Sequence, residues 1–267
     1  MKELILQQST AIRTQILPEV YNSVKHITPD FNAVIKYKTD IIQWLKPIID
    51  LTGYNVYPTC GITEGLNWWY DKEKRGVILK SGDYQWIHPR ETSNEKILYI
   101  SCPSSMDGNF IDIPTDIPVA LDLAYIGSTT IKQISIANNV EYVFFSLSKA
   151  FAMRNIRTGW LFTLQPDPRL EALIHSAKYY NYFAHSIAEH IINKFDIDYV
   201  HSQLQQEQTR VCNSLDFTES DSVWIATTTD SEYSKFIRAN NIARLCLSPV
   251  YNVMNKFYYT TAHTKML

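Results

Sequence analysis

The stretch that decides the fold is YVFFSLSKAFAMRNIRTGW, residues 142–160. An apolar run long enough for a buried strand ends in Ser146, Ser148 and Lys149, and Arg157 follows. A lysine at the end of a buried strand is partly desolvated, so its amine loses a proton more readily and can form a Schiff base. Hydroxyls and a guanidinium beside it suit a phosphate. The stretch therefore predicts a site for a phosphorylated aldehyde.

A plainer interpretation is a strand followed by an ordinary surface lysine and arginine, and for Lys149 alone this interpretation would be favoured. The segment, however, resembles the lysine motif S-x-S-K-x-F-x-x-x-N-x-R-x-G of fold-type I, pyridoxal-phosphate-dependent aminotransferases, in the style of the aspartate aminotransferase superfamily. Matching motifs recur upstream in the same order, from about Gly61 to Trp160. The resemblance implies that pyridoxal 5'-phosphate is the cofactor and that Lys149 holds it.

Strands and helices alternate along the chain, which predicts an α/β fold with a mostly parallel central sheet, helices on both faces and a site at the carboxyl ends of the strands. We expect an N-terminal helical segment over residues 1–50, a large cofactor-binding domain over 51–211 and a reduced C-terminal small domain over 212–267. The resemblance implies an unusually short member of the family. Helices are predicted near 41–48, 62–70, 186–194, 200–211 and 231–239.

Asp122 is the main partner expected for the lysine. It follows an apolar strand, where a carboxylate is costly to bury unless it meets a positive group. The resemblance, through the motif D-x-A-Y, implies that Asp122 pairs with the pyridine nitrogen and that Tyr125 donates to the phenolic oxygen of the cofactor. A strand-end aspartate that caps the next turn is the alternative.

A small-residue turn at Gly61, Ile62 and Thr63 precedes a predicted helix, so backbone N–H groups and the positive end of the helix would face a phosphate. The stretch Gly61–Gly65 resembles the first phosphate-binding turn of the family, G-x-x-x-A. Thr63 adds a hydroxyl there or caps the helix.

Two aromatic residues follow the strand that begins at Gly76. The resemblance implies that an aromatic ring here stacks on the pyridine ring, and Tyr84 holds that place, with Trp86 as competitor. A flat ring would orient the cofactor and exclude water. Packing in the core is the alternative for either residue.

The loop after residues 96–101 departs from the family pattern P-x-N-P-x-G. Ser105 stands at the position of the asparagine that bonds the phenolic oxygen, and Met106 replaces the proline. The shorter serine leaves that bond weakened, water-mediated or absent, with Asn109 nearby as a substitute.

Arg244 lies within an apolar strand, residues 242–247, and resembles the late arginine by which the family holds a substrate α-carboxylate. The planar guanidinium matches a carboxylate with two parallel hydrogen bonds. An exposed edge arginine or an internal salt bridge is the alternative.

Composition narrows the remaining classes of function. The formal net charge of −2 gives no electrostatic case for nucleic acid or an anionic membrane surface. No apolar run reaches a membrane span and the first residues lack a signal-peptide pattern, so we expect a cytoplasmic protein. The cysteines and histidines show no metal-ligand spacing.

The resemblance also implies a homodimer, because family sites lie at a dimer interface, and it gives Tyr37 a contact to the phosphate of the neighbouring subunit; packing is the alternative for Tyr37. The function predicted from the sequence is a pyridoxal-phosphate-dependent aminotransferase acting on an amino acid or related amine. The alternatives are a lyase, decarboxylase or oxidase on the same scaffold, and a catalytically idle binding protein.

Overall fold

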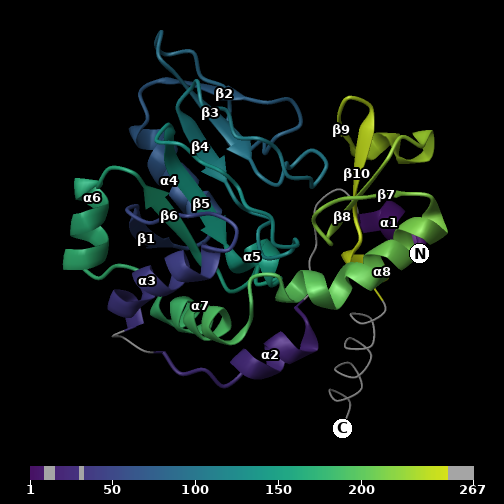
Figure 1. Cartoon of the computed structure of the whole chain (residues 1–267), viewed down its shortest axis with the longest axis horizontal. Coiled ribbons are helices and arrows are strands. Elements are labelled where there is room, and N and C mark those ends of the chain that lie inside the picture. Colours follow the sequence, from purple (N-terminus) through teal and green to yellow (C-terminus); the bar gives the residue numbers. More distant parts are fainter. Residues whose placement is uncertain (9–15, 30–32, 252–267) are drawn as a thin grey trace.

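Two β-sheets lie side by side in the computed structural model, which describes residues 1–8, 16–29 and 33–251 (Figure 1). The larger sheet has the strand order β1-β6-β5-β4-β3-β2, and the smaller one β7-β8-β10-β9. The strands of the larger sheet are β1 (Asn55–Thr59), β2 (Gly76–Leu79), β3 (Lys96–Ser101), β4 (Val119–Asp122), β5 (Val140–Ser146) and β6 (Gly159–Thr163).

The larger sheet is mixed, because one strand runs in the direction opposite to the other five. Strands β2 to β5 pair in parallel, whereas β6 is antiparallel to both β5 and β1. The predicted α/β architecture with a mostly parallel sheet is therefore confirmed. The parallel strands end at one edge of the sheet, and this edge carries the polar residues of the opening stretch.

Helices cover both faces of this sheet, as two consecutive residues of β5 show. Phe144 packs against Trp69 of one helix, with ring centroids 5.7 Å apart, and Phe145 packs against Trp44 of another at 5.8 Å. Because neighbouring strand residues point to opposite faces, the two helices lie on opposite sides. The helices are α1 (Lys2–Gln8), α2 (Pro18–Val24), α3 (Ala33–Leu45), α4 (Ile62–Lys72), α5 (Leu147–Ala150), α6 (Pro168–Leu170) with a π-helical turn (Glu171–Ser176), α7 (Tyr182–Lys194) and α8 (Tyr199–Leu215).

Most predicted elements are present within a few residues of their expected ends. Helix α3 begins well before the predicted one, so Tyr37 lies inside it rather than before it; the side chain of Tyr37 is outside the described residues. Asp167 caps α6 by accepting from the N–H groups of Arg169 and Leu170.

The smaller sheet is antiparallel and contains the predicted late strand with Arg244. Its strands are β7 (Thr218–Glu219), β8 (Ile225–Thr228), β9 (Ile237–Ala239) and β10 (Ile242–Cys246). The helix predicted over 231–239 is correct only in part: a 3-10 helix spans Ser231–Phe236, and the last three residues form β9. Asn240 and Asn241 both have positive φ, as a tight β9–β10 hairpin requires.

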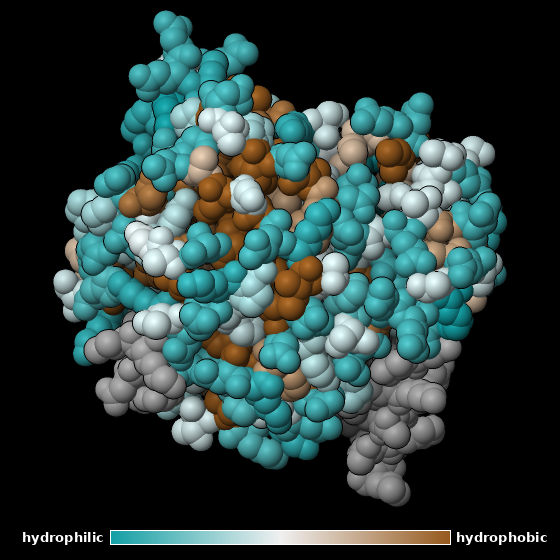
Figure 2. Space-filling model, in the orientation of Figure 1, coloured by the Kyte–Doolittle hydropathy of each residue, from teal (hydrophilic) through white to brown (hydrophobic). Residues whose placement is uncertain are grey.

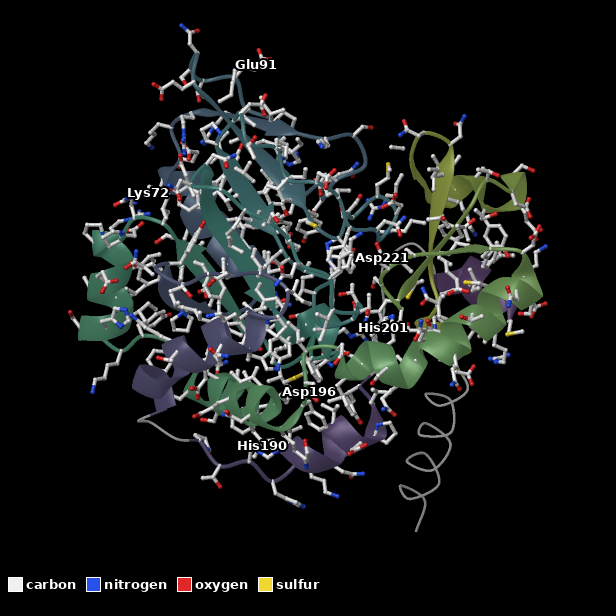
Figure 3. All side chains as sticks on the ribbon, viewed as in Figure 1. Lys72, Glu91, His190, Asp196, His201 and Asp221 are labelled. Carbon is white, nitrogen blue, oxygen red and sulfur yellow. The ribbon has the colours of Figure 1, made fainter. Side chains whose placement is uncertain are left out.

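Hydrogen bonds fix the smaller sheet against loops of the larger one. The hydroxyl of Ser128 lies 2.9 Å from that of Ser222, and the N–H of Val223 donates to the Ser128 carbonyl at 3.0 Å. Asp221, labelled in Figure 3, accepts from the backbone N–H of Phe110 at 2.7 Å. These bonds hold the strand that carries Arg244 in a defined place relative to the edge of the larger sheet.

Helix α1 lies beside the smaller sheet, far along the chain from it (Figure 1). Lys2 forms an ion pair with Glu232 and lies over the ring of Tyr233. The predicted boundary between residues 211 and 212 falls inside α8. The division into domains stays a prediction.

Hydrophilic residues cover most of the face seen in Figure 2, with hydrophobic patches over the part that holds the larger sheet. Among residues 1–8, 16–29 and 33–251, no helix has both the length and the apolar character needed to cross a membrane.

Candidate active site

A small cavity lies at the carboxyl ends of β4 and β5. Asp122 is the last residue of β4, Ser146 the last of β5, and Lys149 lies one turn later in α5. The cavity has a volume of about 110 Å³ and is lined by Ile62, Thr63, Tyr84, Asp122, Ala124, Ser146, Ser148, Lys149 and Arg157. Most of the residues predicted from the sequence to bind the cofactor thus lie around one space.

Lys149 faces two tyrosines. Its Nζ donates to the hydroxyl of Tyr125 at 3.3 Å and lies 4.3 Å from the centroid of that ring and 5.6 Å from the centroid of the Tyr84 ring. Burial raises the pKa of Tyr125, but the cations of Lys149 and Arg244 lower it by more, so its net pKa is below the usual value. The hydroxyl of Tyr125 is therefore prepared to carry negative charge or to give up its proton.

Asp122 is 2% exposed. Its carboxylate accepts from the hydroxyl of Tyr99 at 2.5 Å and from the N–H of Ala124 at 2.7 Å. Burial raises the pKa of Asp122 to about 6, although Lys149 and the Tyr99 hydroxyl act to lower it. A buried carboxylate of this kind is best stabilised by a cationic partner in the cavity.

The lining of the cavity also includes donors for an oxyanion. Arg157 Nη1 lies 3.4 Å from the Ser148 hydroxyl, and Thr63 is in the first turn of α4, where backbone N–H groups face outward. Gly61 precedes that turn with φ of 83°, and a Cβ there would lie 2.6 Å from Arg157 Nη2. A Cβ on Gly159 would in turn meet Gly61 Cα at 2.7 Å. The two glycines let the turn, the arginine and β6 meet closely.

Tyr84 rather than Trp86 is the aromatic residue at the cavity. Trp86 is 52% exposed, and its indole N–H donates to the Asn67 side chain at 3.0 Å, away from the site. The expected competition between the two aromatic residues is therefore decided in favour of Tyr84 by position. Whether its ring stacks on a cofactor stays a prediction.

Ser105 is not among the residues that line the cavity, and its hydroxyl bonds the loop after β2. It donates to the Asp83 carboxylate at 2.9 Å and lies 3.3 Å from the Gly82 carbonyl. Asn109 does not substitute for it, because its side-chain oxygen accepts from the N–H of Asp221 at 3.1 Å, toward the smaller sheet. Of the outcomes expected for Ser105, a direct bond to the phenolic oxygen fits this geometry least.

Arg244 reaches the site from β10. It is 7% exposed, and its Nη1 donates to the Ser105 carbonyl at 2.6 Å and to the Tyr125 hydroxyl at 3.4 Å. None of the ion pairs between described residues includes Arg244. Arg244 is thus neither an exposed edge arginine nor part of a salt bridge between described residues. Among the described residues, the hydrogen-bond partners of this buried guanidinium are a carbonyl and a hydroxyl, which favours an anionic ligand.

Two residues of this network, Asp83 and Tyr99, were not predicted from the sequence. Tyr99 supports Asp122 from the neighbouring strand, and burial raises its own pKa well above the usual value. Ser101 and Asp122 are register partners, which brings β3 side chains beside the carboxylate. A signal was present in each case: an acid next to the expected stacking tyrosine, and a tyrosine in an otherwise aliphatic strand.

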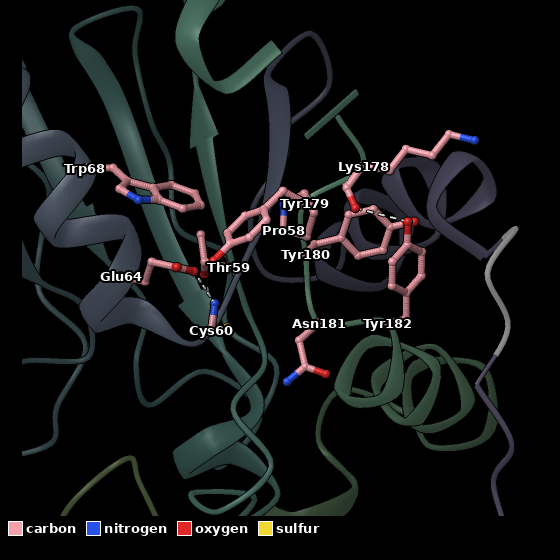
Figure 4. A pocket seen from close by; sticks show the side chains of 10 residues that line it. All are labelled: Pro58, Thr59, Cys60, Glu64, Trp68, Lys178, Tyr179, Tyr180, Asn181 and Tyr182. Carbon is pink, nitrogen blue, oxygen red and sulfur yellow. Dashed lines mark hydrogen bonds between the residues drawn. The ribbon is translucent and has the colours of Figure 1, made fainter. Parts of the chain in front are cut away.

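A second cavity of about 410 Å³ lies on another side of the Gly61 turn (Figure 4). It is lined mainly by aromatic and small polar residues, and Glu64 accepts from the N–H of Cys60 at 2.6 Å. Tyr182 donates to the carbonyl of Lys178 at 3.0 Å on its rim. None of the residues predicted from the sequence to bind the cofactor lines this second cavity, so we place the chemistry at the smaller one.

Within the described parts of the chain, no group of three or more histidine, cysteine, aspartate or glutamate side chains is placed to hold a metal ion. Figure 3 shows His190 and His201 on different helices, α7 and α8.

The donor set fits one kind of molecule. The hydroxyls and the arginine suit a phosphate, the buried carboxylate suits a protonated ring nitrogen, and the lysine suits an aldehyde. Tyr84 adds a flat aromatic face at the same cavity.

The same fold is found in a solved pyridoxal-phosphate-bound lyase and in solved aminotransferases. The pyridoxal-phosphate-bound C-S lyase from Staphylococcus hominis matches with a TM-score of 0.67 at 13% identity, over 97% of this chain and 92% of that one. The aromatic aminotransferase from Pyrococcus horikoshii OT3 matches with 0.64 at 13% identity, over 97% and 96%. An aminotransferase from Staphylococcus aureus matches with 0.61 at 13%, over 95% and 92%.

No protein-family model matches the sequence, and neither does any curated protein. The structural matches confirm at the level of the fold the resemblance to fold-type I enzymes that residues 142–160 predict.

Proposed function

We propose that this chain is a pyridoxal-phosphate-dependent aminotransferase that acts on an amino acid or a related amine. The observation that carries the proposal is the position of Lys149, whose Nζ bonds the Tyr125 hydroxyl at 3.3 Å in a cavity that Asp122 and Arg157 also line. The shared fold with the C-S lyase and the aminotransferases supports the class of enzyme and the cofactor.

Different residues would hold different parts of the cofactor. Arg157, Ser146, Ser148 and the turn of Gly61, Ile62 and Thr63 would hold the phosphate, and Tyr84 would lie against the ring. Asp122 would pair with the ring nitrogen, and the Tyr125 hydroxyl with the phenolic oxygen. When bound, the cofactor supplies an electron sink for the bonds at the amino acid's Cα.

Lys149 would have two tasks, to hold the cofactor through its aldehyde and then to move a proton as general acid and base. The nearby Tyr125 hydroxyl orients the amine, because the two groups share a hydrogen bond. The aromatic rings of Tyr84 and Tyr125 exclude water around Nζ.

A panel of amino acids tests the reaction type. We expect release of the matching oxo acid from a preferred amino acid, with turnover sustained only when a second oxo acid is supplied. Release of carbon dioxide, consumption of oxygen, or elimination products without the second oxo acid would identify the alternatives, a decarboxylase, an oxidase or a lyase. A protein that takes up no pyridoxal phosphate would be an idle binding protein and would contradict the proposal.

Arg244 is proposed to bind the substrate's α-carboxylate, because it is a buried cation whose hydrogen-bond partners among the described residues are a carbonyl and a hydroxyl. We expect Arg244→Ala to raise KM for amino acids by about 30-fold or more, since losing a buried charged contact costs on the order of 2–5 kcal/mol. Arg244→Lys should be nearly as poor, because lysine lacks the planar fork. Steady-state kinetics measure both; an unchanged KM, or equal turnover of amines without a carboxylate, would make Arg244 structural.

We also propose a homodimer in the cytoplasm, with Tyr37 reaching the partner's phosphate site. Tyr179 and Phe183, which are 67% and 51% exposed, lie at or next to the second cavity and provide apolar surface for association. Light scattering that gives a monomer with full activity would contradict the dimer.

A further inference from the structure

Asp83 is a buried carboxylate that accepts four hydrogen bonds. It lies in the loop after β2 and is 7% exposed. Its Oδ1 accepts from the Ser101 hydroxyl at 2.5 Å, the Ser105 hydroxyl at 2.9 Å and the Tyr84 N–H at 2.8 Å, and its Oδ2 accepts from the Ser101 N–H at 3.1 Å. Within residues 1–8, 16–29 and 33–251, Asp83 takes part in no ion pair.

Ser105 connects this carboxylate to the arginine of the smaller sheet. Its hydroxyl donates to Asp83, and its carbonyl accepts from Arg244 Nη1 at 2.6 Å. The same Nη1 lies 3.4 Å from the Tyr125 hydroxyl, which accepts from Lys149. Contacts therefore run without a break from Asp83 through Ser105 and Arg244 to the site.

A buried carboxylate is not expected at position 83 if the side chain only fills space in the loop. Burying it without a cation costs more than burying an amide or hydroxyl. What it adds is direction: an ionised carboxylate only accepts, so the Ser101 and Ser105 hydroxyls must both point their protons at it. With its hydroxyl fixed in this way, the Ser105 peptide is held in one orientation.

We propose that Asp83 is a positioning residue that acts through Ser105 to hold the Arg244 guanidinium where it binds the carboxylate of the substrate. The proposal rests on the function given above, in which Arg244 is the anchor. It assigns to Ser105 a role different from that of the family asparagine, because the backbone carbonyl and not the side chain faces the site. Asp83 itself does not contact the substrate.

Asp83→Asn tests this directly. An amide has one accepting oxygen, and its nitrogen would face either the Ser101 N–H or the serine hydroxyls, so the bond to Ser105 is lost or weakened. We expect KM for amino acids and the dissociation constant of propionate, a carboxylate without an amino group, to rise about tenfold, as for a hydrogen bond to a charged group. Binding of propionamide, its uncharged counterpart, should not change, and kcat should change much less than KM.

Ser105→Ala is the second variant, since it removes only the hydroxyl and leaves Asp83 in place. It should raise the same two constants, and the double variant should be no worse than Asp83→Asn alone, because both changes remove one interaction. The matched control is Asp107→Asn, which removes the same charge from the loop that contains Ser105, but from a carboxylate that accepts from the Asn109 N–H. It should leave both constants unchanged.

Arg244→Ala, titrated with propionate in parallel, separates the two proposals. Weaker propionate binding in Arg244→Ala, with unchanged binding in Asp83→Asn and Ser105→Ala, would overturn the role of Asp83 and leave the anchor intact. Unchanged binding in Arg244→Ala would overturn the anchor and the inference with it. A lower melting temperature in Asp83→Asn without a change in propionate affinity would show that Asp83 only stabilises the loop.

Discussion

Replacing Lys149 by alanine is expected to lower kcat by about 10²–10⁴-fold, the range for removal of a positioned acid or base. The change also removes the amine that would hold the cofactor covalently, whereas Arg157, Ser148 and Asp122 remain to bind it. Pyridoxal phosphate should therefore still bind, but dialysis should remove it. Rapid kinetics with a preferred amino acid and absorbance before and after dialysis measure the two effects.

Lys80→Ala is the control for this variant. Lys80 is exposed directly after β2, so its loss removes an equal charge near the same edge of the sheet without touching the cavity. Activity should stay at the level of the unaltered protein. If Lys149→Ala kept its activity and bound the cofactor irreversibly, another amine would carry the chemistry and the site would be misplaced.

Asp122→Asn is expected to have opposite effects on function and on stability. Cofactor affinity and kcat should fall, because a neutral amide no longer favours a protonated ring nitrogen. The protein without cofactor should become more stable at pH 7.5. Burial raises the pKa of Asp122 from 3.8 to about 6, so the folded protein at that pH carries an ionised carboxylate that it would hold more stably with a proton.

The stability gained by Asp122→Asn depends on pH in a defined direction. A rise from 3.8 to about 6 corresponds to on the order of 3 kcal/mol in the free energy of unfolding. Because the folded pKa of Asp122 lies above the unfolded one, the unaltered protein becomes more stable as the pH falls through about 6. The stability advantage of Asp122→Asn over the unaltered protein should therefore vanish below about 4. Denaturant unfolding at pH 7.5 and 4 measures this, with the exposed Asp116→Asn as control. A variant less stable at pH 7.5 would contradict the cause given for the shift.

The sequence predicted the larger sheet well because its signals are local. The run ending at Ser146 is too apolar for an exposed strand, and the change from apolar to polar residues at Asp122 and Lys149 marks where strands stop. Helix α4 follows from the small-residue turn at Gly61. Each of these features depends on neighbours in the chain.

What the sequence did not predict depends on contacts between distant segments. Asp83 is 22 residues from Ser105, and only the register of β3 brings the two loops together. Residues 237–239 pair with β10 as a strand, although their own pattern continued the predicted helix. Trp86 and Tyr84 could be distinguished only once Trp86 was seen to bond Asn67.

Reduction with borohydride followed by peptide mapping tests the central claim most directly. After loading with pyridoxal phosphate, the protein should be yellow, and borohydride should bleach it while fixing one cofactor per chain on the peptide that contains Lys149. A mass shift confined to that lysine is the predicted result. Modification spread over exposed lysines, or none on the Lys149 peptide, would contradict the account.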